Sequence, residues 1–152
     1  MLVPIEWLKD YTEVNVTTEE FCEKMIMSGS NVESVKLFGE GIENVVVGKV
    51  IKKEKHPDAD KLSVCMVDVG EDEPLQIVCG AANVAEGINV AVARDNSRIP
   101  GPLHGQTQNE GATRIKKGKI RGVLSFGMIC SSQELGFDDK VIPVAHKDGI
   151  WI

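Results

Sequence analysis

The sequence lacks the features of several common protein classes. No run approaches the about 18 apolar residues of a transmembrane helix, and no basic segment precedes an apolar one at the start, so we predict neither membrane anchor nor secretory signal. The four cysteines form no CxxC pair, which disfavours a structural zinc site. Cys65, Cys79 and Cys130 lie in apolar stretches and are expected to be buried thiols of a cytoplasmic protein rather than nucleophiles.

Motifs of the common enzymes are also missing. The sequence contains no GxSxG and no glycine-rich phosphate loop. His56, His104 and His146 are far apart and lie beside proline or glycine or in polar stretches, so we expect surface or turn positions. Asp58 and Asp60 are too few for a cation cage and favour a turn. We therefore predict no catalytic residue and no metal site in this chain.

Aromatic residues are scarce, at 5% of the chain. Between residues 41 and 148 the only aromatic side chains are Phe126 and Phe137. A barrel that stacks unpaired bases displays several aromatic platforms. If this chain binds nucleic acid, we expect it to recognise phosphates and backbone shape rather than base sequence.

The net charge of −6 disfavours a general nucleic-acid coat, but the charge is unevenly distributed. Residues 1–40 hold eight acids and three bases, whereas residues 41–122 hold eleven acids and twelve bases. The segment Arg114–Arg121 has five positive charges in eight residues and no acid. In an extended segment, Lys117, Lys119 and Arg121 would share a face at a spacing of about 7 Å, with Lys116 opposite. A solvated loop beside a strand remains the alternative.

The hydrophobic pattern predicts two helices and then a β domain. Thr17 and Glu20 form a capping box before a second short helix, and Gly29 suits its end. After residue 41, short alternating segments indicate strands at Val45–Ile51, Leu62–Val69, Leu75–Cys79, Ile88–Val92 and around Met128–Cys130. The polar segment Ser97–Thr113 is interpreted as a long loop. We predict a mainly β fold, a small five-stranded barrel or sandwich preceded by a small helical part.

Four ordered motifs resemble those of a known domain. They are Val45–Val50, His56–Cys65, Gln76–Val84 and Lys119–Ser131. Together they resemble the tRNA-binding OB-fold domain of bacterial phenylalanyl-tRNA synthetase beta subunits, of some methionyl-tRNA synthetases and of free-standing tRNA-binding proteins. The Ser97–Thr113 loop departs from that pattern because it is longer and more polar. The resemblance implies a five-stranded OB-fold barrel.

The first and last residues favour one host among these proteins. Val3–Tyr11 and Val32–Val35 resemble the amino terminus of the phenylalanyl-tRNA synthetase beta subunit, and Asp148–Ile152 suits the same subunit after its OB domain. The resemblance implies a fragment of a longer subunit with three parts. Residues 1–41 would be the front half of a discontinuous helical domain, 42–148 the OB domain, and 149–152 the start of a missing back half.

The resemblance implies a noncatalytic role for this chain. The family joins phenylalanine to tRNA with ATP and Mg2+, which would bind elsewhere in the enzyme. The implied partners are tRNA, the alpha subunit and the rest of the beta subunit in a heterotetramer, in the cytoplasm and without a membrane. The apolar residues of the helical part would lack their partner surface, so we also expect self-association of the fragment or local disorder in residues 1–40. A free-standing tRNA-binding or chaperone-like OB protein, or an unrelated barrel with a small-molecule site, is the alternative.

Charge and motif positions select the candidate tRNA-binding residues. The four cations expected to contact phosphates are Lys116, Lys117, Lys119 and Arg121. The residues that match family motif positions near the expected RNA-facing rim are Asn83, Ser125, Met128 and Ser131. For Ser125 and Met128, a purely structural role is an equal alternative. His56, Asp60 and Lys61 are expected to form a turn that fixes the first hairpin, and Lys61 is included among the RNA-binding residues.

Overall fold

A computed structural model describes residues 3–103, 112–137 and 149–152 and divides the chain into two compact units, Met1–Phe38 and Gly39–Ile152. The predictions for His104, His146 and the middle of the Ser97–Thr113 loop lie outside these residues. None of the helices in the described part of the chain is long and apolar enough to cross a membrane.

The first unit contains helices α1 (Ile5–Leu8) and α2 (Thr18–Met27). The predicted capping box is confirmed, because Thr17 accepts a hydrogen bond from the Glu20 amide and Glu20 accepts one from the Thr17 amide. Gly29, at φ +91°, ends α2 in the left-handed conformation that glycine favours. Neither helix buries a residue, and the side chain of Trp7 is 69% exposed.

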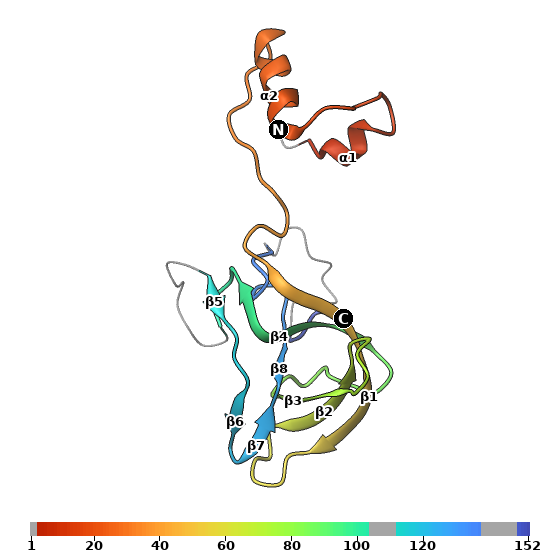
Figure 1. Ribbon diagram of the computed structural model, residues 1–152, viewed down its shortest axis with the longest axis vertical. Helices are drawn as coiled ribbons and strands as arrows, with labels where there is room; N and C mark the ends of the chain where they lie inside the picture. Colours follow the sequence, from red (N-terminus) through yellow and green to blue (C-terminus); the bar gives the residue numbers. More distant parts are fainter. Residues whose placement is uncertain (1–2, 104–111, 138–148) are drawn as a thin grey trace. The chain divides into compact units, whose positions relative to one another are not determined.

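The second unit is built from antiparallel strands, of which the first and the fourth are long and the others are short (Figure 1). They are β1 (Glu43–Lys55), β2 (Ser63–Asp68), β3 (Leu75–Cys79), β4 (Asn89–Ile99), β5 (Thr113–Arg114), β6 (Gly118–Ile120), β7 (Val123–Ser125) and β8 (Gly127–Ile129). Five of them form a sheet in the order β3-β2-β1-β4-β5, β8 pairs with β4, and β6 and β7 form a separate hairpin. β1 is long because it pairs with β2 along one part and with β4 along the other.

Side-chain and backbone hydrogen bonds between β3 and the β7–β8 segment bring the sheet round on itself. The Val78 amide donates to Ser125 Oγ (3.0 Å), and the Phe126 amide donates to the Gln76 carbonyl (2.9 Å). The Gln76 side-chain amide donates to the Leu124 carbonyl (2.7 Å). The result is a nearly closed five-stranded antiparallel barrel, consistent with the OB-fold that the sequence predicted.

Two apolar clusters fill the barrel unit. Val50, Cys65, Val67 and Ile77 belong to the first, and Ile99 belongs to the second, with Ile115 and Cys130. In β2 the pattern allowed either face to be inside, because both faces are apolar. The structure buries Cys65 and Val67 completely, whereas the alternating set with Val64 and Met66 is only partly covered.

The predicted Ser97–Thr113 loop is wrong at both described ends. Ser97–Ile99 continue β4, and Thr113 pairs with Ile99 as part of β5. Just before the predicted loop, Asn96 takes a positive φ of +64°, and backbone hydrogen bonds join Asn96 and Ser97 to Ile115. Tertiary pairing therefore extends the strand through polar residues that have little intrinsic strand preference.

The buried cysteines lead to a prediction about pH. Burial raises the pKa of Cys65 from 9.0 to about 11 and that of Cys130 to about 12, and it also raises the pKa of Cys79. Folding keeps these thiols neutral, so their contribution to stability is complete below pH 9 and is lost as pH rises toward 11. We expect the urea concentration at the midpoint of unfolding to fall over this range, and to fall less in Cys130→Ala.

The difference in burial also predicts which cysteine reacts. Iodoacetamide at pH 8 should modify the partly exposed Cys22 alone, as mass spectrometry can show.

Candidate nucleic-acid interface

The basic segment predicted from the sequence begins in β5, continues through Lys116 and Lys117 into β6, the outer strand of the β6–β7 hairpin, and ends at the hairpin tip. Ile120 pairs with Val123, so Arg121 and Gly122 form a two-residue turn, with φ of +45° and +87°. Two consecutive positive φ values define a type I′ turn, whose twist matches that of the flanking strands. Only Gly118–Ile120 is strand, and Arg121 lies at the hairpin tip. The continuous extended strip through Lys117, Lys119 and Arg121 is therefore not what the chain forms.

The four candidate cations of the basic segment are nevertheless exposed. Lys119 pairs with Leu124, whereas the next pair brings in Ser125, which is buried, so Lys119 faces away from the barrel. Lys116, Lys117 and Arg121 are exposed as well. Within the described residues none of these four forms an ion pair, in contrast to Arg94, Arg98 and Lys55 elsewhere on the barrel. The four cations are free to contact an external anion.

Two residues outside the basic segment fix the hairpin to the barrel. At its start, the Lys117 amide donates to Asp95 Oδ1 (2.8 Å). Near its tip, His56 Nε2 lies 3.2 Å from the Ile120 carbonyl oxygen. The sequence analysis did not select Asp95, because a single carboxylate in a polar run carries no signal of such a long-range contact. Both contacts place the cations relative to the rest of the barrel.

His56 begins a turn, one of the two positions expected for the histidines, but it does not lie at the surface. Its side chain is 2% exposed, and Nδ1 accepts a hydrogen bond from the Asp58 amide. The turn that follows, closed by the Leu62 amide bond to the Ala59 carbonyl, confirms the predicted turn. A histidine directly after a strand and before a Pro-Asp turn is enclosed by the turn itself and by the hairpin above it.

The turn carries Lys61 to the tip of the basic hairpin. Lys61 and Arg121 line one hollow of about 370 Å³, together with Asp58, Ala59, Asp60 and Leu62. Asp60 forms an ion pair with Lys55 (2.7 Å) and is therefore not the partner of Lys61. The Lys61 side chain is exposed and has no ion pair among the described residues. Segments 60 residues apart in the sequence thus place two cations at one end of the barrel.

Asn83 lies away from these cations and binds the last residues of the chain. Its amide donates from Nδ2 to the Ile150 carbonyl (2.9 Å) and accepts at Oδ1 from the Ile150 amide (3.0 Å). Ile150 is 3% exposed and belongs to the first apolar cluster, and the Trp151 ring packs edge-on against Phe137 at 4.8 Å. These contacts join 149–152 to the barrel unit; the predicted division into domain halves stays a prediction.

The three remaining motif residues all have structural partners. Ser125 closes the barrel and donates to the Gly127 carbonyl, and Met128 packs partly buried against the second apolar cluster. Ser131 Oγ accepts from the Glu134 amide, and both its amide and its hydroxyl donate to Glu134 Oε2. Their contact with RNA stays a prediction, but the hydroxyls of Ser125 and Ser131 already form hydrogen bonds within the barrel.

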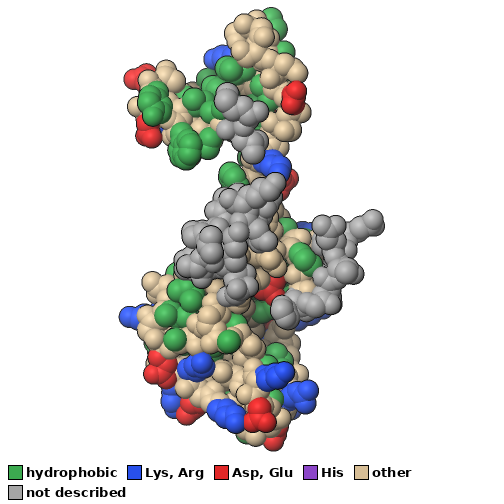
Figure 2. All heavy atoms as spheres, turned by 180° about the vertical axis from the view of Figure 1, so that it is seen from behind, with side chains coloured by type: hydrophobic (Ala, Val, Ile, Leu, Met, Phe, Trp, Pro, Cys, Tyr) green, Lys and Arg blue, Asp and Glu red, His purple; other side chains and the backbone are tan. Residues whose placement is uncertain are grey.

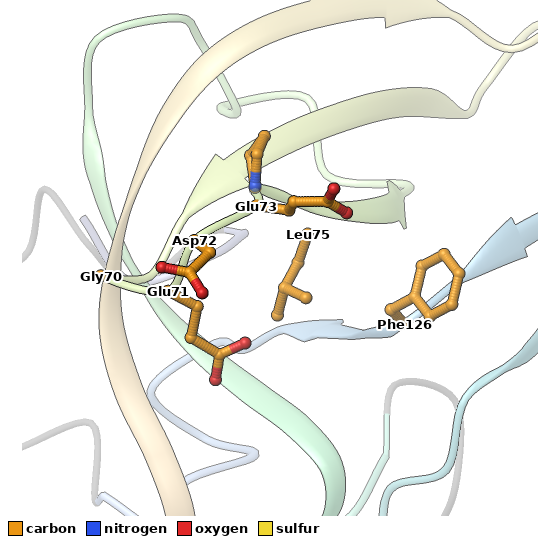
Figure 3. Close-up of a pocket in the computed structure, with 7 residues that line it drawn as sticks. Gly70, Glu71, Asp72, Glu73, Leu75 and Phe126 are labelled. Carbon is orange, nitrogen blue, oxygen red and sulfur yellow. The ribbon is translucent and has the colours of Figure 1, made fainter.

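An acidic turn lies elsewhere on the barrel. Gly70–Pro74, Leu75 and Phe126 line a hollow of about 580 Å³. Figure 3 shows the carboxylates of Glu71 and Asp72 on one side of Leu75 and the Phe126 ring on the other. Acidic and basic side chains are also interspersed on the barrel face in Figure 2, so the positive field is local. In the described residues no three histidine, cysteine or acidic side chains gather as metal ligands.

Comparison with known proteins identifies relatives along the whole chain. The family model described as "Putative tRNA binding domain" matches residues 45–149. The phenylalanine–tRNA ligase beta subunits of Bacillus cereus and Staphylococcus haemolyticus are each 45% identical to this chain, and that of Latilactobacillus sakei is 48% identical. Each alignment covers 100% of this chain but 18% of the relative, so the chain spans about a fifth of the length of these curated relatives.

A solved structure also resembles this chain. It is the crystal structure of the C-terminal domain of Plasmodium vivax p43, with 24% sequence identity and a TM-score of 0.41. The match covers 62% of this chain and 48% of that one.

Proposed function

Because the chain belongs to the tRNA-binding domain family, we propose that its barrel binds tRNA as a noncatalytic module of a phenylalanine–tRNA ligase beta subunit. The observation that carries the proposal is the group of exposed cations just before and on the β6–β7 hairpin, which form no ion pair within the described residues. Relatives of about five times this length, matched along this whole chain, favour the module over a free-standing tRNA-binding protein.

Phosphates are the groups that this surface would contact. Lysine and arginine neutralise phosphates and release counterions, a contribution to binding that does not depend on base sequence. The described part of the barrel exposes Phe126 at its rim, at 39%, and this ring lines the acidic hollow rather than the basic hairpin. We therefore expect contact with the tRNA backbone, with little readout of bases.

The rest of the ligase would supply the chemistry. In this proposal, ATP and Mg2+ bind in other parts of the longer protein. In the same proposal, the partners are the alpha subunit and the remaining beta subunit in a cytoplasmic heterotetramer. This chain's own contribution is to hold tRNA by its backbone while aminoacylation takes place elsewhere.

A salt series with single substitutions tests the proposal. We expect tRNA binding to weaken as salt increases, and Lys119→Ala or Arg121→Ala to lower the log–log slope by about one, since each removes one phosphate contact. The loss should be similar for cognate and noncognate tRNA. Filter binding at several salt concentrations measures both quantities.

Glu73→Ala is the matched control, because it changes one exposed charge in the acidic turn. It should not weaken binding. Unchanged affinity and slope in both cation variants would remove the hairpin from the tRNA site and leave the barrel with a scaffolding role.

A further inference from the structure

We propose that His56 is a positioning residue that holds the β6–β7 hairpin, and with it Lys119 and Arg121, in the geometry that binds tRNA. This inference rests on the proposed function for its effect on binding, but not for its effect on the hairpin. The sequence had assigned His56 to the first hairpin, between β1 and β2. The structure joins it to the second hairpin as well, across 64 residues of sequence.

Both ring nitrogens of His56 are used. Nδ1 accepts a hydrogen bond from the Asp58 amide (3.1 Å), so it carries no proton in this arrangement. Nε2 then carries the ring proton and donates it to the Ile120 carbonyl oxygen at 3.2 Å. With the ring 2% exposed, water does not readily replace either partner. The imidazole thus links the turn of Lys61 to the last strand residue before Arg121.

Besides its hydrogen bond to His56, the outer strand β6 has few hydrogen bonds to the rest of the barrel. Among the described residues β6 pairs with β7 alone, over three residue pairs, and neither strand belongs to the main sheet. An isolated two-stranded hairpin is marginally stable in water. β7 is attached to β3 through Ser125 and Leu124, but β6 depends on Asp95 at its start and on His56 at its end. Ile120 is 41% exposed, so side-chain burial contributes little to holding the tip.

Loss of the His56 bond is expected to release the tip. Lys119 and Arg121 would then have to become ordered when tRNA binds. The entropic cost of fixing the backbone of about one residue corresponds to an affinity about tenfold weaker. The number of phosphate contacts would stay the same. The affinity should therefore fall with little change in the salt slope, a result that differs from the loss of a cation.

Two variants of similar size separate the hydrogen bond from the packing. His56→Gln keeps an N–H donor in reach of Ile120, whereas His56→Leu has none. In the full chain, we expect His56→Leu to speed amide exchange in Gly118–Ser125 and to weaken tRNA binding about tenfold. Core amides such as those of Val67 and Val92 should remain protected. His56→Gln should restore most of both properties.

A double-mutant cycle tests whether His56 acts through the cations. In a Lys119→Ala/Arg121→Ala background, His56→Leu should cause no further loss of binding. An equal loss of binding in both backgrounds would overturn the proposal. An unchanged rate of amide exchange in the hairpin of His56→Leu would also overturn it. If the cation variants bind tRNA like the original chain, the proposed function fails, and the amide exchange of the hairpin still tests the role of His56.

A measurement on the unmodified chain covers the case in which His56→Leu does not fold. The ¹⁵N chemical shifts of the imidazole report which ring nitrogen carries the proton. We expect the Nε2–H form, as the donor to Ile120 requires. The Nδ1–H form would overturn the proposal without any substitution.

Discussion

Replacing Ser125 with valine is expected to lower the free energy of unfolding by about 2–5 kcal/mol, because two buried backbone groups would lose their partner. The hydroxyl accepts from the Val78 amide at 3.0 Å and donates to the Gly127 carbonyl at 2.9 Å. The side chain is 3% exposed, so water does not readily replace these bonds. Valine has no polar atom and is larger than serine, so the change leaves no cavity, and crowding by the added methyl group contributes to the loss of stability.

Urea unfolding followed by circular dichroism measures this loss. Leu124→Ala is the control, because Leu124 is the neighbouring residue and is 44% exposed, so its replacement should change stability little. Amide exchange of Val78 should accelerate in Ser125→Val more than exchange in β1. A stability within about 0.5 kcal/mol of the original chain would show that barrel closure does not depend on this hydroxyl.

Removing three cations of the basic segment together is expected to weaken tRNA binding about 100-fold at 0.15 M salt. Each lost phosphate contact lowers the salt slope by about 0.7–0.9, which corresponds to about a four- to fivefold loss at this salt concentration. The variant is Lys117→Ala/Lys119→Ala/Arg121→Ala. All three side chains are exposed and none has an ion pair in the described structure, so the barrel should keep its stability.

A second triple variant has the same net charge. Lys24, Lys36 and Lys49 are also exposed, and their replacement by alanine removes three cations outside the hairpin. If binding depends only on the total charge, both triple variants should lose affinity equally. If the hairpin is the binding site, the Lys24/Lys36/Lys49 variant should lose much less tRNA affinity and keep the salt slope of the original chain. Equal losses would therefore contradict a localised interface.

Sequence motifs were sufficient to predict the domain and its cations. The capping box at Thr17, the strand Leu75–Cys79 and the turn after His56 depend on residues close together in the chain, and all three are confirmed. The resemblance to tRNA-binding domains likewise depends on the order and spacing of short motifs. Local sequence patterns describe such features because their partners are near neighbours.

Tertiary structure decided the features whose partners are distant. The inward face of β2 could not be chosen from a strand that is apolar on both sides. The role of Ser125 in closing the barrel depends on its hydrogen bond with Val78, 47 residues away in the sequence. The burial of His56 depends on the hairpin that contains Ile120, 64 residues away. The sequence determined which cations this protein carries. Where they lie depends on hydrogen bonds between segments 22 to 64 residues apart, which no local pattern records.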